Sequence, residues 1–251
     1  AVDGLGRTSA YGPWQSLVVD GAAPEVTLDV NRTRVVSGSL IAGGPLALYG
    51  DVADTSGVES VDVCVDGDCR AAALQLLPGP APVGVDDLPD DPLGLGGATA
   101  CGGAELVRSF DVIDDFAIGE VRVGITADHA DRGDLRVTLV SPSGTAVTIL
   151  PGDGTLARGN RNLDAVFFDA AVGATDTGLE HDTGLPLHDR QLRPFEPLQV
   201  LRGTSSRGTW RLRVCDADPT ADDGLYYHAR LELVPAVTAS TSGSWSDSLQ
   251  F

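Results

Sequence analysis

Apolar and polar residues alternate over several short stretches of the chain, and this alternation predicts β-strands. The clearest stretches cover residues 121–128, 135–142, 146–150 and 209–216. No segment keeps the spacing of an amphipathic helix over several turns. Many short strands separated by turn-forming residues are typical of β-sandwiches and jelly rolls, so the expected fold class is all-β.

Length and composition suggest more than one unit. The chain has 251 residues, of which 42% are hydrophobic, enough for one large or two modest domains. Residues 78–102 are rich in Pro, Gly and Asp and are expected to form a linker or extended arm. Residues 173–197 contain His181 and His188 and are expected to form a long loop.

We expect a soluble piece of a longer protein. No apolar run approaches the roughly 18 residues of a membrane helix, and no basic-then-apolar signal segment opens the chain. The sequence also contains no Met. These features favour a segment excised from a larger polypeptide.

Charge limits the classes of partner. The chain carries 17 Arg and no Lys against 36 Asp and Glu, for a formal net charge of −19. A surface with this potential repels phosphate backbones, and the chain has no basic stripe to offset it. Nucleic acid is therefore excluded as a partner, and no membrane insertion is expected.

The four cysteines predict two disulfides. Asp66-Gly67 favours a two-residue hairpin turn, which places Cys64 opposite Cys69 in a non-hydrogen-bonded pair where a disulfide can close. Cys101 with Cys215 then follows by elimination. The alternative is four buried thiols in a cytosolic protein.

The N-terminal and C-terminal segments resemble the Ig-like repeats of bacterial surface proteins. The segment 20–28 is similar to the linker that opens such a module, and Asp54 to Val58 matches its "D-x-S-G-V" turn. Residues 1–9 resemble the closing strand of a preceding module, and 242–251 resemble a Trp-bearing strand that follows the hairpin.

These resemblances imply a domain order. It consists of a closing strand in 1–20, an Ig-like module in 21–77, the linker in 78–102, an independent domain in 103–235 and a returning strand in 236–251. The middle domain is either inserted into the Ig-like module or merely adjacent to it.

The middle domain resembles the P domain, or Homo B, of kexin- and furin-type proprotein convertases. The matching motifs, in order, are His129 with Arg132-Gly133-Asp134-Leu135 ("H-x-x-R-G-D-L"), Ser141-Pro142-Ser143-Gly144-Thr145 ("S-P-x-G-T"), Gly208-Thr209-Trp210 ("G-T-W") and the closing Asp223-Gly224-Leu225. The chain departs from the family at His228-Ala229, where a Trp is usual. The resemblance implies a jelly-roll β-sandwich.

Most of these motif residues also have a structural interpretation. Ser-Pro-Ser-Gly is a turn sequence in its own right. Trp210 alternates with Leu212 and Val214 and is expected to point into the core. Adhesion through the tripeptide Arg132-Gly133-Asp134 is the less favoured interpretation.

The sequence gives little support for catalysis. Gly203-Thr204-Ser205 superficially resembles the nucleophile segment of subtilisin-like proteases, but Ser206 onward leads into a strand rather than a helix. Segments for the other two triad members are missing. His129 is expected to be a structural hydrogen-bonding residue, and the chain is not expected to be an enzyme.

Calcium is the one cofactor that the sequence favours. Clustered carboxylates supply the hard oxygen ligands that Ca²⁺ prefers. The candidate ligands are Asp128, Asp131, Asp216, Asp218, Asp222 and Asp223. None follows the EF-hand spacing, and some bacterial members of the P-domain family bind calcium.

The expected function is that of a non-catalytic, secreted or cell-surface module. It would stabilise, space or dock a larger extracellular protein, and the resemblance points to a subtilisin-like protease as the neighbouring domain. The alternatives are an adhesion module of a bacterial surface stalk, which would recognise a glycan or a protein, and a protease fragment that acts through Ser205.

Overall fold

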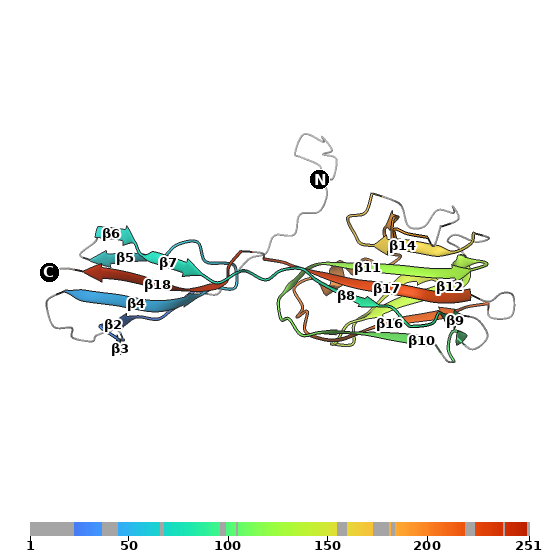
Figure 1. The fold of residues 1–251 in the computed structure, drawn as a ribbon, viewed down its shortest axis with the longest axis horizontal. Helices are drawn as coiled ribbons and strands as arrows, with labels where there is room; N and C mark the ends of the chain where they lie inside the picture. Colours follow the sequence, from blue (N-terminus) through green and yellow to red (C-terminus); the bar gives the residue numbers. More distant parts are fainter. Residues whose placement is uncertain are drawn as a thin grey trace, which may run out of the picture. The chain divides into compact units, whose positions relative to one another are not determined.

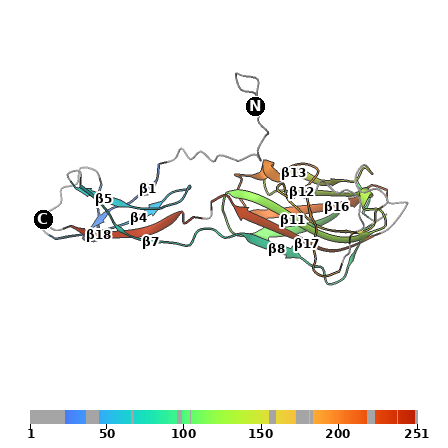
Figure 2. The ribbon, with the colours of Figure 1, turned by 90° about the horizontal axis from the view of Figure 1, so that it is seen from above.

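The computed structural model describes residues 23–36, 45–65, 68–95, 99–103, 105–154, 160–172, 181, 184–218, 224–237 and 239–249. They form an all-β fold, as the alternation predicted (Figures 1 and 2). The chain divides into two compact units, one made of Ala1–Gly79 with Ala239–Phe251 and the other of Pro80–Thr238. In the described part of the chain, no helix is long and apolar enough to cross a lipid bilayer.

The first unit contains a six-stranded sheet and a hairpin. The sheet order is β3-β2-β4-β18-β7, and β1 also pairs with β4. Its strands are β1 (Glu25–Val26), β2 (Asp29–Val30), β3 (Thr33–Arg34), β4 (Leu46–Ala53), β7 (Ala73–Leu76) and β18 (Ser242–Leu249). The hairpin consists of β5 (Asp62–Val65) and β6 (Asp68–Ala71).

Strand β18 holds the sheet of this first unit together. It lies between β4 and β7, with Trp245 opposite Gly50 on one side and Leu74 on the other. A Cβ atom at Gly50 would lie 2.4 Å from Trp245 Nε1 and 1.8 Å from the Thr27 carbonyl oxygen, so only glycine fits there. The C-terminal segment thus completes a sheet begun before residue 80.

The second unit is a sandwich of two sheets. One sheet has the order β10-β16-β12-β13, with β10 (Leu106–Val112), β16 (Gly208–Asp216), β12 (Leu135–Val140) and β13 (Ala146–Pro151). The other has the order β15-β14-β11-β17-β8, with β15 (Gln191–Leu192), β14 (Leu163–Phe167), β11 (Ile118–His129), β17 (Gly224–Pro235) and β8 (Val83–Asp87). Strand β9 (Leu93–Leu95) also pairs with β17.

The core of the second unit lies between these sheets. In β16, Trp210, Leu212 and Val214 are buried, while Arg211 and Arg213 are exposed. Residues from both sheets form one continuous apolar cluster. The inward direction of Trp210 predicted from the sequence is therefore confirmed.

The structure differs from the sequence prediction in two segments. Part of the predicted linker 78–102 is strand, because Val83–Asp87 and Leu93–Leu95 pair with β17. Val83 and Val85 alternate with Gly84 and Asp86, and this short pattern was hidden by the surrounding Pro, Gly and Asp. The predicted loop 173–197 contains the two-residue strand Gln191–Leu192, which pairs in parallel with β14. The strand expected in 1–9 lies outside the described residues.

A partly buried polar cluster attaches β8 to the rest of the sandwich. The Asp87 carboxylate accepts two hydrogen bonds from Arg108 at 2.6 Å and one from Tyr226 Oη at 2.6 Å. Burial alone would raise the pKa of Asp87, but these hydrogen bonds outweigh it and hold the pKa below its usual value. Since β10 and β17 belong to different sheets, Asp87 connects both sheets through one side chain.

We expect Asp87→Asn to lower the free energy of unfolding by about 1.5–3 kcal/mol at neutral pH, because it weakens charge-assisted hydrogen bonds. The wild-type advantage should be complete above the usual carboxyl pKa of about 3.9 and should shrink as the pH falls below it. Urea denaturation between pH 7 and pH 3 measures this. Asp90→Asn, an exposed neighbour in the same segment, is the control and should change stability little.

Candidate functional site

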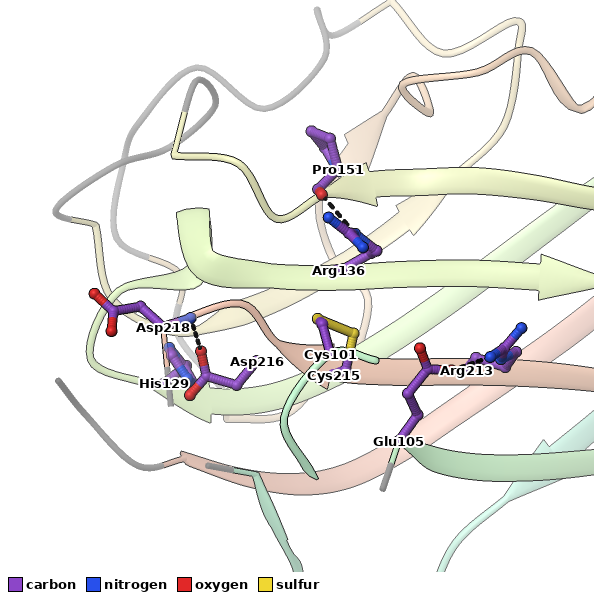
Figure 3. The surroundings of a disulfide bond; sticks show 9 residues. All are labelled: Cys101, Glu105, His129, Arg136, Pro151, Arg213, Cys215, Asp216 and Asp218. Carbon is purple, nitrogen blue, oxygen red and sulfur yellow. Dashed lines mark hydrogen bonds and ion pairs between the residues drawn. A yellow bond between two sulfur atoms is a disulfide. The ribbon is translucent and has the colours of Figure 1, made fainter. Parts of the chain in front are cut away.

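The most concentrated polar cluster lies at one end of the second unit, beside a disulfide (Figure 3). Its members come from the end of β11, the 3-10 helix η2 (Arg132–Asp134) and the end of β16. We call this cluster, made of His129, Asp131, Arg132 and Asp216, the latch. Two of these residues, His129 and Arg132, belong to the P-domain-like motif "H-x-x-R-G-D-L".

His129 and Asp216 form the centre of the latch. Both side chains are fully buried, and His129 Nε2 lies 3.4 Å from Asp216 Oδ2. The other ring nitrogen, Nδ1, lies 2.7 Å from the Asp131 carbonyl oxygen. Neither His129 Nε2 nor Asp216 Oδ2 has a hydrogen bond within the described structure. Because a buried polar atom without a partner is costly, the proximity of these two atoms partly offsets the cost of burying each.

Asp216 also organises the backbone around it. Its Oδ1 atom accepts a hydrogen bond from the Asp218 backbone N–H at 2.9 Å. Its carbonyl oxygen accepts from Cys101 N–H at 3.0 Å, next to the disulfide that joins Cys101 to Cys215. The segment before β10 is therefore held to the end of β16 by a covalent bond and a backbone hydrogen bond.

Arg132 binds the backbone of a neighbouring segment. It is 1% exposed, and its Nη1 donates to the carbonyl oxygens of Arg161 at 2.7 Å and Asn162 at 3.0 Å. Asp131 caps η2, because its Oδ1 accepts from Gly133 N–H at 2.9 Å. The tripeptide Arg132-Gly133-Asp134 thus lies in a folded turn where the first two residues are buried.

Two further motifs, "S-P-x-G-T" and "G-T-W", meet at the opposite end of β12. Ser141 closes the turn to β13, because its carbonyl oxygen accepts from Gly144 N–H and its hydroxyl from Thr145 N–H. Gly208 has φ of +127°, and a Cβ atom there would lie 2.7 Å from Pro142 Cβ. The turn "S-P-x-G-T" therefore packs against the start of the strand that continues through Thr209 and Trp210. Trp210 Nε1 donates to the Ser206 carbonyl oxygen at 2.8 Å.

Both predicted disulfides are present. Cys64 is directly opposite Cys69 in the β5–β6 pairing, with Cα atoms 4.0 Å apart. Cys101 and Cys215 have Cα atoms 4.9 Å apart and are separated by 114 positions in the sequence. The hairpin argument was sufficient for the first disulfide, and elimination gave the second.

The predicted calcium ligands do not gather in the described structure. The Asp128 carboxylate accepts a hydrogen bond from Tyr227 Oη at 2.5 Å, while Asp131 caps η2 and Asp216 faces His129. Within the described ranges, no group of three or more His, Cys, Asp or Glu side chains is arranged to hold a metal ion. Asp222 and Asp223 lie outside the described residues, so calcium binding stays a prediction.

A second polar cluster was missed by sequence reasoning. His188 stacks on His228 with ring centroids 4.9 Å apart, and His228 Nε2 lies 3.2 Å from Asp86 Oδ1. Burial, together with the neighbouring His228, lowers the pKa of His188 to about 4, so this ring is neutral at pH 7. No sequence signal joins these residues, because Asp86 lay in the predicted linker and His188 in the predicted loop.

Asp164 attaches this cluster to the sheet. It is fully buried, and its Oδ1 atom accepts from Thr126 Oγ1 at 2.6 Å and from His188 N–H at 2.9 Å. His181 Nδ1 accepts from the Asp164 backbone N–H at 2.9 Å. These bonds hold the described part of the 181–190 segment against β11 and β14.

Ser205 has a structural partner. Its hydroxyl donates to Asp115 Oδ1 at 2.6 Å, and Ser206 donates to the Asp114 carbonyl oxygen. The histidine rings contact other residues: His129 contacts Asp131, His181 contacts Asp164, and His228 contacts His188 and Asp86. In the part of the chain that the structure describes, Ser205 is therefore not paired with a histidine base.

Residues 118–233 match the family model of the proprotein convertase P-domain. This match confirms the resemblance of the middle domain to the P domain of proprotein convertases. It does not reach the first unit, whose Ig-like character stays a prediction. No curated protein sequence is significantly similar to the chain.

Three solved structures are similar to the chain at low identity. The serine protease of Aeromonas sobria is 18% identical over 62% of this chain and 27% of the protease, with a TM-score of 0.35. The complex of that protease with its chaperone gives 16% identity over 70% of this chain and 36% of the other, with a TM-score of 0.36. A structure of infectious bursal disease virus, Gt strain, is 11% identical over 89% of this chain and 59% of the viral chain, with a TM-score of 0.28. The chain spans less than two thirds of each of these chains.

We expect Asp216→Asn and His129→Gln each to lower the free energy of unfolding by about 1–3 kcal/mol, because each disturbs a buried polar pair. The double variant should cost less than the sum of the two, since the partners are in contact. Thermal and urea unfolding of the four proteins measures this coupling.

Asp114→Asn is the matched control for the latch, because Asp114 is exposed. Strictly additive effects of the two latch variants, or effects no larger than that of the control, would contradict the structural role of the latch.

Proposed function

We propose that the chain is a non-catalytic accessory module of a subtilisin-like protease, because residues 118–233 match the family model of the proprotein convertase P-domain. Its second unit docks on the protease domain of the same parent polypeptide and stabilises that domain. The P-domain match is the observation that carries this proposal. In convertases the P domain packs on the protease and supports its fold.

The chemistry of the second unit supports an accessory role. The polar motif residues His129, Arg132 and Ser141 are used inside the fold. His129 faces the buried Asp216, Arg132 binds backbone carbonyl groups and Ser141 closes a turn. The Ser205 hydroxyl is bonded to Asp115. A docking role requires only a stable surface, which a sandwich with a continuous apolar core provides.

The two disulfides support an extracellular setting. Disulfides form and persist in oxidising compartments and are rare in the cytosol. The bond between Cys101 and Cys215 closes a long loop, and such a cross-link stabilises the fold by several kcal/mol in the chain-entropy model. A module that supports a secreted protease benefits from this stability.

The proposal is tested on the full-length parent polypeptide with a fluorophosphonate probe that labels active serine proteases. One sample is wild type, and the other lacks residues 80–238, with Gly79 joined to Ala239. This junction is feasible because β7 and β18 are adjacent strands of the first unit. Both samples are heated stepwise and then labelled.

We expect the label on a serine outside the 251 residues, and we expect the deletion variant to lose labelling at a lower temperature than wild type. Label on Ser205 would show that the chain itself carries the activity. A parent polypeptide without a labelled serine, or equal heat resistance of the two samples, would also contradict the proposal.

A further inference from the structure

A polar hollow of about 480 Å³ lies on the sheet of the first unit, over β2, β4, β18 and β7. Its volume falls in the range of roughly 300–1,000 Å³ that is usual for small-molecule sites. The side chains that give it its chemistry are Asp29, Tyr49, Asp51, Gln75, Ser244 and Ser246.

These side chains lie on the sheet face that points away from the core of the first unit. Along β4, Leu48 and Val52 are buried, whereas Tyr49 and Asp51 between them are exposed. Residues that are paired across neighbouring strands lie on the same face of a sheet. Ser246 is paired with Tyr49, and Ser244 with Asp51, so both serines share the exposed face.

The strand register also places residues of β7 at the hollow. Gln75 is paired with Ser244, and Ala73 with Ser246. The row between them, Gly50, Trp245 and Leu74, directs its side chains to the core face, so small groups and backbone form the floor of the hollow. Tyr49 also lines the hollow, and this residue is 43% exposed.

The hollow offers hydrogen-bonding groups that the fold does not use. Within the described residues, the side chains of Asp51, Gln75, Ser244 and Ser246 make no hydrogen bond. The Asp29 carboxylate is different, because it accepts from Arg34 at 2.7 Å. The free groups combine acceptors, in the carboxylate, with donors, in the amide and the hydroxyls.

We propose that this hollow is a binding site for a neutral saccharide. Sugar hydroxyls both donate and accept, so they match a carboxylate, an amide and two hydroxyls together. The apolar C–H face of a sugar ring can pack on the exposed ring of Tyr49. This site lies in the first unit and does not depend on the role proposed for the P-domain.

Charge and hydrogen-bonding chemistry both count against the main competing ligands. A phosphate or an acidic sugar would be repelled by Asp51 and by the net charge of −19. A basic peptide would be attracted by that charge, but ammonium and guanidinium groups only donate hydrogen bonds. These cationic groups would satisfy Asp51 but could not accept hydrogen bonds from Gln75 or from the two serines, so they match the hollow less completely than a sugar does.

Isothermal titration of the 251-residue chain tests the proposal. The probes are maltohexaose, cellohexaose and chitohexaose, with a polyarginine peptide as the competing ligand. We expect at least one saccharide to bind. Tyr49→Ala should weaken this binding by about tenfold or more, because an aromatic contact at the centre of a site dominates its affinity.

Two further variants make the result specific. Asp51→Asn should weaken saccharide binding severalfold, because a carboxylate forms stronger hydrogen bonds than an amide oxygen. Phe195→Ala removes an aromatic ring of similar exposure from the second unit and should leave binding unchanged.

Three results would overturn the proposal. They are the absence of saccharide binding at concentrations up to about 10 mM, binding of polyarginine alone, and saccharide binding that neither Tyr49→Ala nor Asp51→Asn weakens. Thermal unfolding of each variant confirms that its fold is intact. Because no protease is present in this experiment, its outcome is independent of the proposed accessory role.

Discussion

The antiparallel pairing of β11 with β17 is the constraint on which the second unit depends. The two strands are the longest in the described structure, and they pair from Ile118 opposite Pro235 to His129 opposite Gly224. β14 adds to one side of the pair, while β8 and β9 add to the other. Because His129 ends β11, the position of the latch also follows from this pairing. Figure 1 shows the two strands side by side along the sheet.

The polar residues of the P-domain-like motifs, together with Asp216, serve mainly to close the ends of this sandwich. His129, Arg132 and Asp216 secure one end of β12, and the turn at Ser141 packs near Gly208 at the other. Burying polar groups is costly unless they find partners, so these contacts specify how the strands end rather than provide chemistry. The proposed saccharide site and the proposed docking role belong to different units and can be tested separately.

The sequence was sufficient to predict the features that arise from local patterns. Alternation identified the strands around Val123, Val137 and Leu212, and the Asp66-Gly67 turn identified the first disulfide. It failed where contacts join distant segments of unremarkable composition. Asp87 reaches Arg108 and Tyr226 from a segment rich in Pro and Asp. His188 reaches His228 from the predicted loop. Such pairs form only after the sheet has been assembled, so no local propensity encodes them.

We infer that the second unit is an autonomous sandwich built on the β11–β17 pair. The most direct test is native-state hydrogen exchange on residues 80–238 expressed alone under oxidising conditions. We predict a single cooperative unfolding transition, with the slowest amide exchange in Ile118–His129 and Gly224–Pro235. An unfolded fragment, or exchange in these two strands that is faster than in β10 and β13, would contradict the claim.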